Sequence, residues 1–253
     1  MKSPHPPTAH PHRGFSPVGL ENISAVSNYG RGAAHMPLLK DMKESFDIGS
    51  EADPRYQNIW PPAGVADTFQ PTFTSFFQSC YRAELAILEA ISIGVGLSAQ
   101  TLGQMHAFQT NELRLTHYPE VARGEFAHAT RIAAHTDFGT ITLLFQDRVG
   151  GLQMEVPPGS GCFVDVPSGG RSECIVNVGD CLNKWTGLHS ARHRVHLSEQ
   201  MTEDRVPERF SIAYFAKPDR DVLLRPLLSE CSNTGDKYMT ADEFQHMRIA
   251  GTY

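Results

Sequence analysis

A histidine and an aspartate stand two residues apart in the stretch RIAAHTDFGTITLLFQD, where His135 and Asp137 precede a run of strand-forming residues. An Asp-Phe-Gly-Thr turn beside an exposed histidine would explain this pattern without any chemistry. The same two side chains would also supply half of a metal site, because imidazole and carboxylate groups are common ligands of first-row transition metals. The metal interpretation requires a third ligand elsewhere in the chain.

His193 is the candidate third ligand, because it enters a predicted strand in the segment SARHRVHL. Alone, such a histidine is better explained as a structural residue, so the weight rests on its combination with His135 and Asp137. Two histidines and one carboxylate on a rigid β-scaffold can occupy one face of an iron(II) octahedron and leave the opposite positions open. Zinc would favour a tetrahedral site with one open position, and the sequence does not exclude it.

A candidate anion clamp lies in the segment ERFSIAYF, where Arg209 and Ser211 are two residues apart. Side chains at such positions of a strand point to the same face, and a guanidinium beside a hydroxyl is suited to hold a carboxylate. In ELRLTHYP the same rule places Arg114, Thr116 and Tyr118 on one face. The phenol of Tyr118 could therefore add a hydrogen bond to the same anion.

The first part of the chain is expected to be helical and loop-rich. Residues 1–13, rich in proline and histidine, are expected to form a disordered leader. In the next part, residues 14–110, the segment PLLKDMKESFDIG is expected to form a short helical turn and NIWPPAGV a proline-broken loop. Apolar residues recur at three- and four-residue steps over 69–93, which predicts a helix that ends near Gly94.

The second part, residues 111–253, is expected to be β-rich and to end in a helix. Seven runs rich in branched and aromatic residues alternate with glycine and proline turns, which is typical of an antiparallel sandwich or barrel. The runs are ELRLTHYP, GTITLLFQD, GLQMEVP, GCFVDVP, CIVNVGDCL, ARHRVHLS and RFSIAYFAKP. The tail TADEFQHMRIAG has a threonine N-cap and acidic residues in its first turn, as closing helices often do.

Composition describes an ordinary globular protein of 253 residues with 40% hydrophobic and 20% charged residues. A net charge of −6 without a Lys/Arg cluster argues against nucleic acid and anionic membranes as partners. Neither a signal peptide nor an apolar run long enough to span a bilayer is apparent. The five cysteines fit no zinc spacing and are expected to be reduced thiols. We therefore expect a cytoplasmic monomer that binds a small molecule.

Taken together, the motifs resemble those of the iron(II)- and 2-oxoglutarate-dependent dioxygenases of the isopenicillin N synthase-like superfamily. The match runs in family order from about residue 14 to residue 253, through KESFDIG, NIWP, LRLTHYP, HTDFGTITLLFQD, VGGLQM, VNVGDCLNKWT, SARHRV, RFSIAYF and KYMTADEF. The resemblance implies a mainly β fold, with a double-stranded β-helix (jelly-roll) core, flanking helices before it and one helix at the C-terminus.

The resemblance also implies the cofactors and the residues that hold them. His135, Asp137 and His193 match the iron ligands, and His189 and His196 do not occupy that motif position. Arg209 and Ser211 match the pair that holds the distal carboxylate of 2-oxoglutarate, which Tyr118 assists. The implied oxidoreductase consumes O2 and 2-oxoglutarate, releases succinate and CO2, and hydroxylates, desaturates or rearranges a small organic molecule of specialised metabolism.

Three residues are candidate substrate contacts. Phe138 follows a candidate iron ligand, and Phe215 shares the face of Arg209 and Ser211 by period two. Arg114 could meet an acidic or carbonyl-bearing substrate, although an internal ion pair would explain it as well. Plain core positions remain an alternative for both phenylalanines.

Two other functions remain open. Family members usually carry several dozen residues before the first match, with an early PVIDL-type strand, and their loop before the distal histidine is about two residues longer than residues 186–190 allow here. The chain could therefore be a truncated, non-catalytic member that at most binds metal. A cupin-like isomerase would need no Arg-x-Ser clamp, so Arg209→Ala should affect it little.

Overall fold

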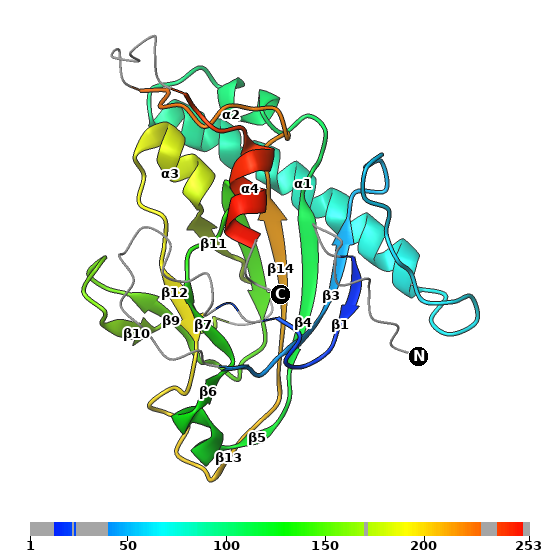
Figure 1. Ribbon diagram of the computed structural model, residues 1–253, viewed down its shortest axis with the longest axis vertical. Coiled ribbons are helices and arrows are strands. Elements are labelled where there is room, and N and C mark those ends of the chain that lie inside the picture. The colour runs from blue at the N-terminus through cyan, green and yellow to red at the C-terminus, as the bar shows by residue number, and fades with distance from the viewer. Residues whose placement is uncertain (1–12, 22, 24–39, 170–171, 229–236, 250–253) are drawn as a thin grey trace.

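Two antiparallel sheets form the centre of the protein in this computed structural model, which describes residues 13–21, 23, 40–169, 172–228 and 237–249 (Figure 1). The six-stranded sheet has the order β1 (Gly14–Ser16), β3 (Glu44–Gly49), β4 (Glu112–Tyr118), β14 (Arg209–Ala216), β8 (Ile141–Gln146) and β11 (Ile175–Val178). The four-stranded sheet has the order β10 (Phe163–Asp165), β9 (Leu152–Glu155), β12 (His193–Val195) and β7 (Ile132–His135). All seven predicted β-runs contain one of these strands, so the mainly β, jelly-roll fold is confirmed.

Two short strand pairs form separate two-stranded sheets. Strand β13 (Arg205–Val206) pairs antiparallel with β5 (Val121–Ala122), and β2 (Lys40–Asp41) pairs in parallel with β6 (Ala129–Thr130). The helical elements are α1 (Phe69–Gly94), α2 (Thr101–Gln104), the 3-10 helix η2 (Arg123–Ala127), α3 (Asp180–Thr186) and α4 (Ala241–Ile249). The long helix and the closing helix lie where the sequence predicts them.

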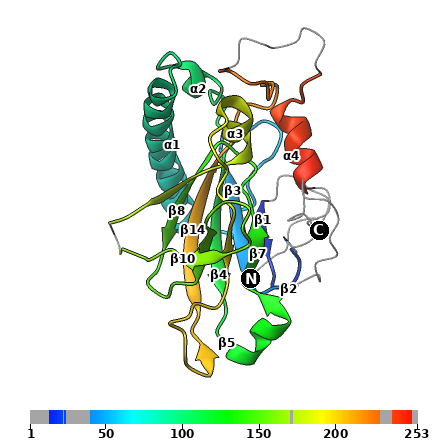
Figure 2. The same cartoon turned by 90° about the vertical axis from the view of Figure 1, so that its left-hand side faces the viewer.

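The two faces of the six-stranded sheet follow from the period-two alternation of its strands. On β14, Tyr214 points outward and packs edge-to-face on Phe77 of α1, with ring centroids 5.3 Å apart. Leu113, Leu143 and Leu88 join the same buried cluster, so the main core lies between α1 and the sheet. Figure 2 shows α1 on one side of β8 and β14, and α4 on the other. The opposite residues of these strands face the four-stranded sheet.

The segment KESFDIG differs from its prediction. Instead of a helical turn, Glu44–Gly49 forms β3, which pairs antiparallel with β4 along its whole length. Phe46 and Ile48 pack in the core on the α1 side, whereas Ser45 and Asp47 are buried polar residues on the alternate face. Hydrogen bonding to a strand about 70 residues away fixes this conformation, and local periodicity carries no signal of such a partner.

Strands β1 and β3 join the sheet from before residue 110, and the division of the chain at that residue stays a prediction. The expected leader falls outside the described residues, except for Arg13. In the described part of the chain, none of the helices has the length and apolar character needed to cross a bilayer.

Candidate metal centre

The three predicted ligands meet at the mouth of the space between the sheets. His135 is the last residue of β7, Asp137 follows in the turn, and His193 is the first residue of β12. Strands β7 and β12 are neighbours, and His193 lies directly opposite His135. The Asp137 Oδ1 atom is 3.6 Å from Nε2 of His135 and 3.9 Å from Nε2 of His193. The ligand atoms of the three residues all lie within 4.8 Å of one another.

Both imidazoles are oriented by the backbone. His135 Nδ1 lies 2.8 Å from the Ala133 carbonyl oxygen, and His193 Nδ1 lies 3.0 Å from that of Ala191. A carbonyl oxygen can only accept, so each Nδ1 carries a proton, and each Nε2 is directed toward Asp137. This arrangement is the usual one for histidines that bind a metal, since the backbone fixes both ring orientation and tautomer.

Asp137 uses its second carboxylate oxygen for support. Thr142 Oγ1 donates to Asp137 Oδ2 over 2.6 Å, and Asn177 Nδ2 donates to the same atom over 2.7 Å. Burial alone would raise the pKa of Asp137, but His193, His135 and the Thr142 hydroxyl together hold that pKa well below its ordinary value. The group therefore stays an anion while only 5% of its side chain is exposed.

The His193 imidazole has a lowered pKa, mainly because burial disfavours its charged form. A neutral imidazole is the form that binds a metal. Two neutral imidazoles and one carboxylate are the donor set of the iron(II) facial triad, so the residues present fit an iron(II) ion with open coordination positions.

A cavity of about 430 Å³ begins at the triad and runs between the two sheets. Most of its wall is apolar, and polar groups concentrate at the triad and on the inner face of β4 and β14. Its apolar walls include Ile23, Ile132, Leu144, Leu152, Met154, Val166, Ile175, Val178, Val195 and Phe215. A volume of this size suits a small organic molecule.

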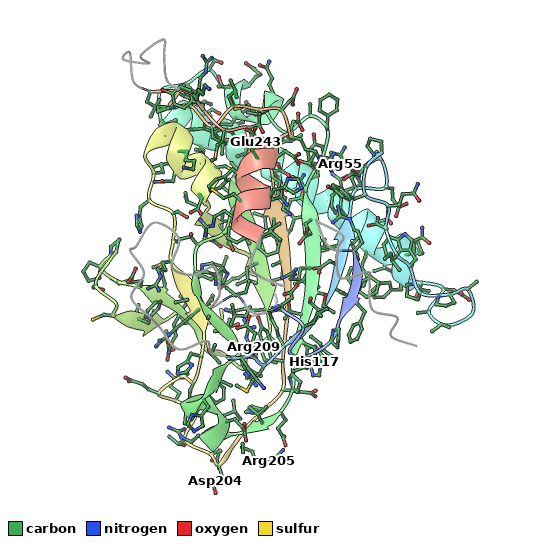
Figure 3. The ribbon with its side chains drawn as sticks, in the orientation of Figure 1. Arg55, His117, Asp204, Arg205, Arg209 and Glu243 are labelled. Atoms are coloured by element: carbon green, nitrogen blue, oxygen red, sulfur yellow. The ribbon has the colours of Figure 1, made fainter. Side chains whose placement is uncertain are left out.

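The predicted anion clamp lines the same cavity. Arg209, Ser211 and Tyr118 all contribute to the wall, and Arg209 lies opposite Tyr118 in the β14–β4 pair. Figure 3 shows Arg209 nearer the centre of the molecule than Arg205, which lies at the tip. The Arg209 guanidinium lies 4.8 Å above the Tyr118 ring centroid and donates from Nη2 to Gln146 Oε1 over 2.7 Å. Its Nε and Nη1 atoms are buried without a hydrogen-bond partner.

A guanidinium that is 1% exposed and has two nitrogen atoms without a hydrogen-bond partner is costly unless an anion joins it. The Nε and Nη1 hydrogen atoms of Arg209 remain available to an anion, and charge-assisted hydrogen bonds of this kind are strong. The position of Arg209 on the wall of the metal-site cavity therefore fits an anionic co-substrate that reaches from the clamp to the metal.

The predicted substrate contacts have three different positions. Phe215 lines the cavity as expected from period two. Phe138 does not line the cavity, so this prediction is wrong. Asp137 points into the cavity and Phe138 points away from it, and the Arg248 guanidinium lies 4.3 Å from the centroid of the Phe138 ring. Arg114 reaches the cavity wall, but its Nε donates to Asp47 over 2.6 Å and its Nη2 to Glu21 over 3.0 Å. An internal ion-pair network therefore engages Arg114.

The histidines outside the motif take other positions. His189 lies in the short loop before β12 and lines the cavity, while His196 contacts Thr130 and the ring of Phe126. The shortened loop nevertheless delivers His193 to its place opposite His135.

Several residues near the site have no motif that identifies them. Thr142 and Asn177 orient Asp137, and Gln146 binds Arg209; Lys43 lines the cavity beside Arg114. Alternation along β8 could have indicated two of them, since Thr142 and Gln146 share one face of this strand with Leu144. A polar Asn177 inside the apolar run CIVNV was a second such signal.

Comparison with known proteins agrees with this chemistry. The family model described as the 2OG-Fe(II) oxygenase superfamily matches residues 109–218. A relative named 2-oxoglutarate-dependent dioxygenase gloF, from Glarea lozoyensis, is 38% identical over the whole chain and 80% of its own length. Another, named proline hydroxylase buaE, from Petromyces alliaceus, is 42% identical over the whole chain and 79% of its own length.

Solved structures extend the agreement to the fold. A full-length protein of Neurospora crassa, crystallised in complex with alpha-KG, superposes with a TM-score of 0.79 and is 32% identical. The alignment covers 95% of this chain and 74% of that one. A further structure of the same Neurospora crassa protein contains alpha-KG and thymine and superposes with a TM-score of 0.78.

Proposed function

The chain belongs to the 2OG-Fe(II) oxygenase superfamily, and from that premise we propose that His135, Asp137 and His193 hold its iron(II) and that Arg209, Ser211 and Tyr118 hold its 2-oxoglutarate. The protein is a 2-oxoglutarate-dependent dioxygenase, an oxidoreductase whose cofactor is iron(II) and whose co-substrates are 2-oxoglutarate and O2. The bound iron supplies the oxidative decarboxylation of 2-oxoglutarate to succinate and CO2 and the oxidation of the substrate.

The side chains of the site bind, orient and exclude water. Asp137, kept anionic by its surroundings, and the imidazoles of His135 and His193 would present three ligand atoms to the metal. Arg209 holds the far carboxylate of 2-oxoglutarate and directs its keto acid end toward the triad. The apolar walls formed by residues such as Leu144, Leu152 and Ile175 keep bulk water from the reacting groups.

The substrate we propose is a small organic molecule of specialised metabolism, with a largely apolar body. The volume and the apolar walls of the cavity support this size and character. Support also comes from relatives: one is named a proline hydroxylase, and the Neurospora crassa protein binds thymine together with alpha-KG. Hydroxylation is the simplest outcome, while desaturation and rearrangement would use the same site.

One observation carries the proposal: the triad lines the same cavity as the Arg209 guanidinium, two of whose buried nitrogen atoms have no hydrogen-bond partner. The test is an anaerobic titration of the purified chain with iron(II) and 2-oxoglutarate, which follows the visible charge-transfer band of the chelate. We expect a band in the native chain that is lost in His193→Ala and strongly weakened in Arg209→Ala. No band from the folded native chain would favour the non-catalytic alternative.

The absence of nucleic-acid and membrane partners, the monomeric state and the cytoplasmic location stay predictions from the sequence. A cupin-like isomerase would be supported if Arg209→Ala left the function unchanged. The titration therefore tests the dioxygenase function against both alternatives.

A further inference from the structure

A second buried guanidinium lies beside the proposed 2-oxoglutarate clamp. Arg131 is 1% exposed and lies just before β7, the strand that ends at His135. Its guanidinium lies 5.8 Å from the centroid of the Tyr118 ring, which also contacts Arg209 at 4.8 Å. One aromatic ring on the cavity wall therefore touches two buried cations.

The two arginines are tied together through the backbone. Arg131 Nη2 donates to the carbonyl oxygen of Pro207, two residues before Arg209. Arg131 is not itself part of the cavity wall, so it lies behind the clamp. This arrangement lets Arg131 fix the Tyr118 ring and the start of β14 while it adds charge to the region.

Within the described part of the chain, no carboxylate forms an ion pair with Arg131 or Arg209, and Asp147 acts on Arg131 only through its nearby charge. Five buried nitrogen atoms of this cluster lack a hydrogen-bond partner: Nε and Nη1 of Arg131, Nε and Nη1 of Arg209, and Nε2 of Gln146. All five are donors. A cluster of unsatisfied donors with two positive charges is suited to an anion, since burying unpaired charge is otherwise unfavourable.

The electrostatics agree with this geometry. Burial, followed by the nearby charge of Arg209, lowers the pKa of Arg131 to about 10. Arg131 remains charged at neutral pH, so the two guanidiniums repel each other in the free protein. A carboxylate beside them would offset this repulsion.

We propose that Arg131 is a positioning residue for the distal carboxylate of 2-oxoglutarate, acting through Tyr118 and by its charge behind Arg209. This inference rests on the proposed function, because it assigns Arg131 to the same co-substrate site. The arginine pair makes the site selective for 2-oxo acids that carry a second carboxylate over those that carry one.

The test compares two co-substrates that differ only at the far end. The chain, loaded anaerobically with iron(II), is titrated with 2-oxoglutarate and separately with 2-oxopentanoate, which lacks the distal carboxylate. Dissociation constants are read from the chelate band and checked by thermal unfolding with redox-inert manganese(II). The variants are Arg131→Met, Arg131→Lys and the matched control Arg205→Met, whose exposed side chain lies at the far tip of the molecule (Figure 3).

In Arg131→Met, we expect the dissociation constant for 2-oxoglutarate to rise about tenfold, the order expected for a partly screened charge, and that for 2-oxopentanoate to stay unchanged. Arg131→Lys keeps the charge and should restore most of the preference for 2-oxoglutarate. Arg205→Met should leave both constants unchanged.

A purely structural role would weaken both co-substrates equally, and that result, or no change in either constant, would overturn the inference. If Arg131→Met does not fold, Arg131→Gln decides, because it also removes the charge but keeps a polar side chain, and a structural role again predicts equal losses. No chelate band in the native chain would instead contradict the proposed function itself. The two failures are therefore distinguishable.

Discussion

At the scale of single residues, the two carboxylate oxygens of Asp137 have separate tasks. Oδ1 faces the two imidazoles, while Oδ2 accepts hydrogen bonds from Thr142 and Asn177. Hydrogen bonds to the second oxygen fix the carboxylate so that one oxygen remains directed at the metal position. Such supporting contacts are commonly worth a factor of about 10–100 in metal affinity.

Asn177→Ala should therefore weaken iron(II) binding about tenfold, while leaving the chain folded. Affinity can be measured by anaerobic titration, with manganese(II) as a redox-inert check. Asn183→Ala is the control, because the Asn183 amide donates to the Leu188 carbonyl on an exposed surface of α3. Equal metal affinity in the native chain and Asn177→Ala would show that Asp137 does not depend on this support.

At the scale of the elements, two glycines allow close backbone contacts around the loop that carries Asp137. Gly139 lies in this loop, and Gly179 follows β11. A Cβ at Gly179 would lie 2.3 Å from the Gly139 carbonyl oxygen and 3.1 Å from that of Asp137. The Gly139 position is equally close to the Ala216 carbonyl oxygen, at 2.3 Å. Both contacts are with backbone, so a side chain here would push the loop that carries Asp137.

Gly179→Ala should lower the stability by about 1–3 kcal/mol, the usual range for overpacking, and should also weaken metal binding. Thermal unfolding and the metal titration measure the two effects. Gly94→Ala is the matched control, because Gly94 is the last residue of α1 and no atom lies within 4 Å of a Cβ added there. This substitution should be neutral or slightly stabilising. An unaffected Gly179→Ala variant would contradict the close approach.

Helix α1 is joined to the sheet by a buried polar group as well as by its apolar face. Glu84 of α1 accepts from the Tyr214 hydroxyl over 2.7 Å and from Asn111 Nδ2 over 2.9 Å. Burial raises the pKa of Glu84 to about 8 from its ordinary 4.5, although both hydrogen bonds lower it. The carboxyl is therefore neutral in the folded chain at neutral pH.

The sign of the pH effect follows. Because the folded pKa of Glu84 exceeds the unfolded one, the stability is unaffected below about pH 4.5, falls as the pH rises toward about 8, and is flat above. Glu84→Gln mimics the neutral carboxyl, so its melting temperature should depend less on pH between 5 and 8 and should exceed that of the native chain at pH 8. Identical pH profiles of the two proteins would show that Glu84 titrates normally.

The sequence could predict the elements wherever local alternation or helical periodicity marks them, which covers the seven strand runs and both long helical segments. It missed β3, because a distant partner strand determines that conformation. It predicted His135, Asp137, His193, Arg209 and Ser211 as site residues from the HxD and RxS spacings and the SARHRV segment, and the structure brings all five to one cavity. Alternation marks Thr142, Gln146 and Asn177 as polar positions on strands, but cross-strand register decides which side chains they and Arg131 meet, and the sequence does not show that register.

At the scale of the whole molecule, one face of the six-stranded sheet contributes most of the core and the other face lines the candidate site. The main core lies between α1 and the outer face of the six-stranded sheet, whereas the inner face surrounds a cavity with buried, uncompensated positive charge. The inner side is thus stabilised less than its burial suggests, and it gains stability when an anion binds. Ligand binding should therefore raise the melting temperature of the whole domain.

With manganese(II) present and 2-oxoglutarate at about 100 times its dissociation constant, ligand binding should add about 2.7 kcal/mol to the free energy of unfolding. The melting temperature of a domain of this size rises by about 2–4 °C per kcal/mol. Arg209→Met should melt no lower than the native chain without ligand, because it removes a buried unpaired charge, and it should lose the rise caused by 2-oxoglutarate. EDTA should abolish the rise in the native chain as well, since chelation requires the metal. If Arg209→Met instead melted well below the native chain and still responded to 2-oxoglutarate, Arg209 would be a structural residue and the anion would bind elsewhere.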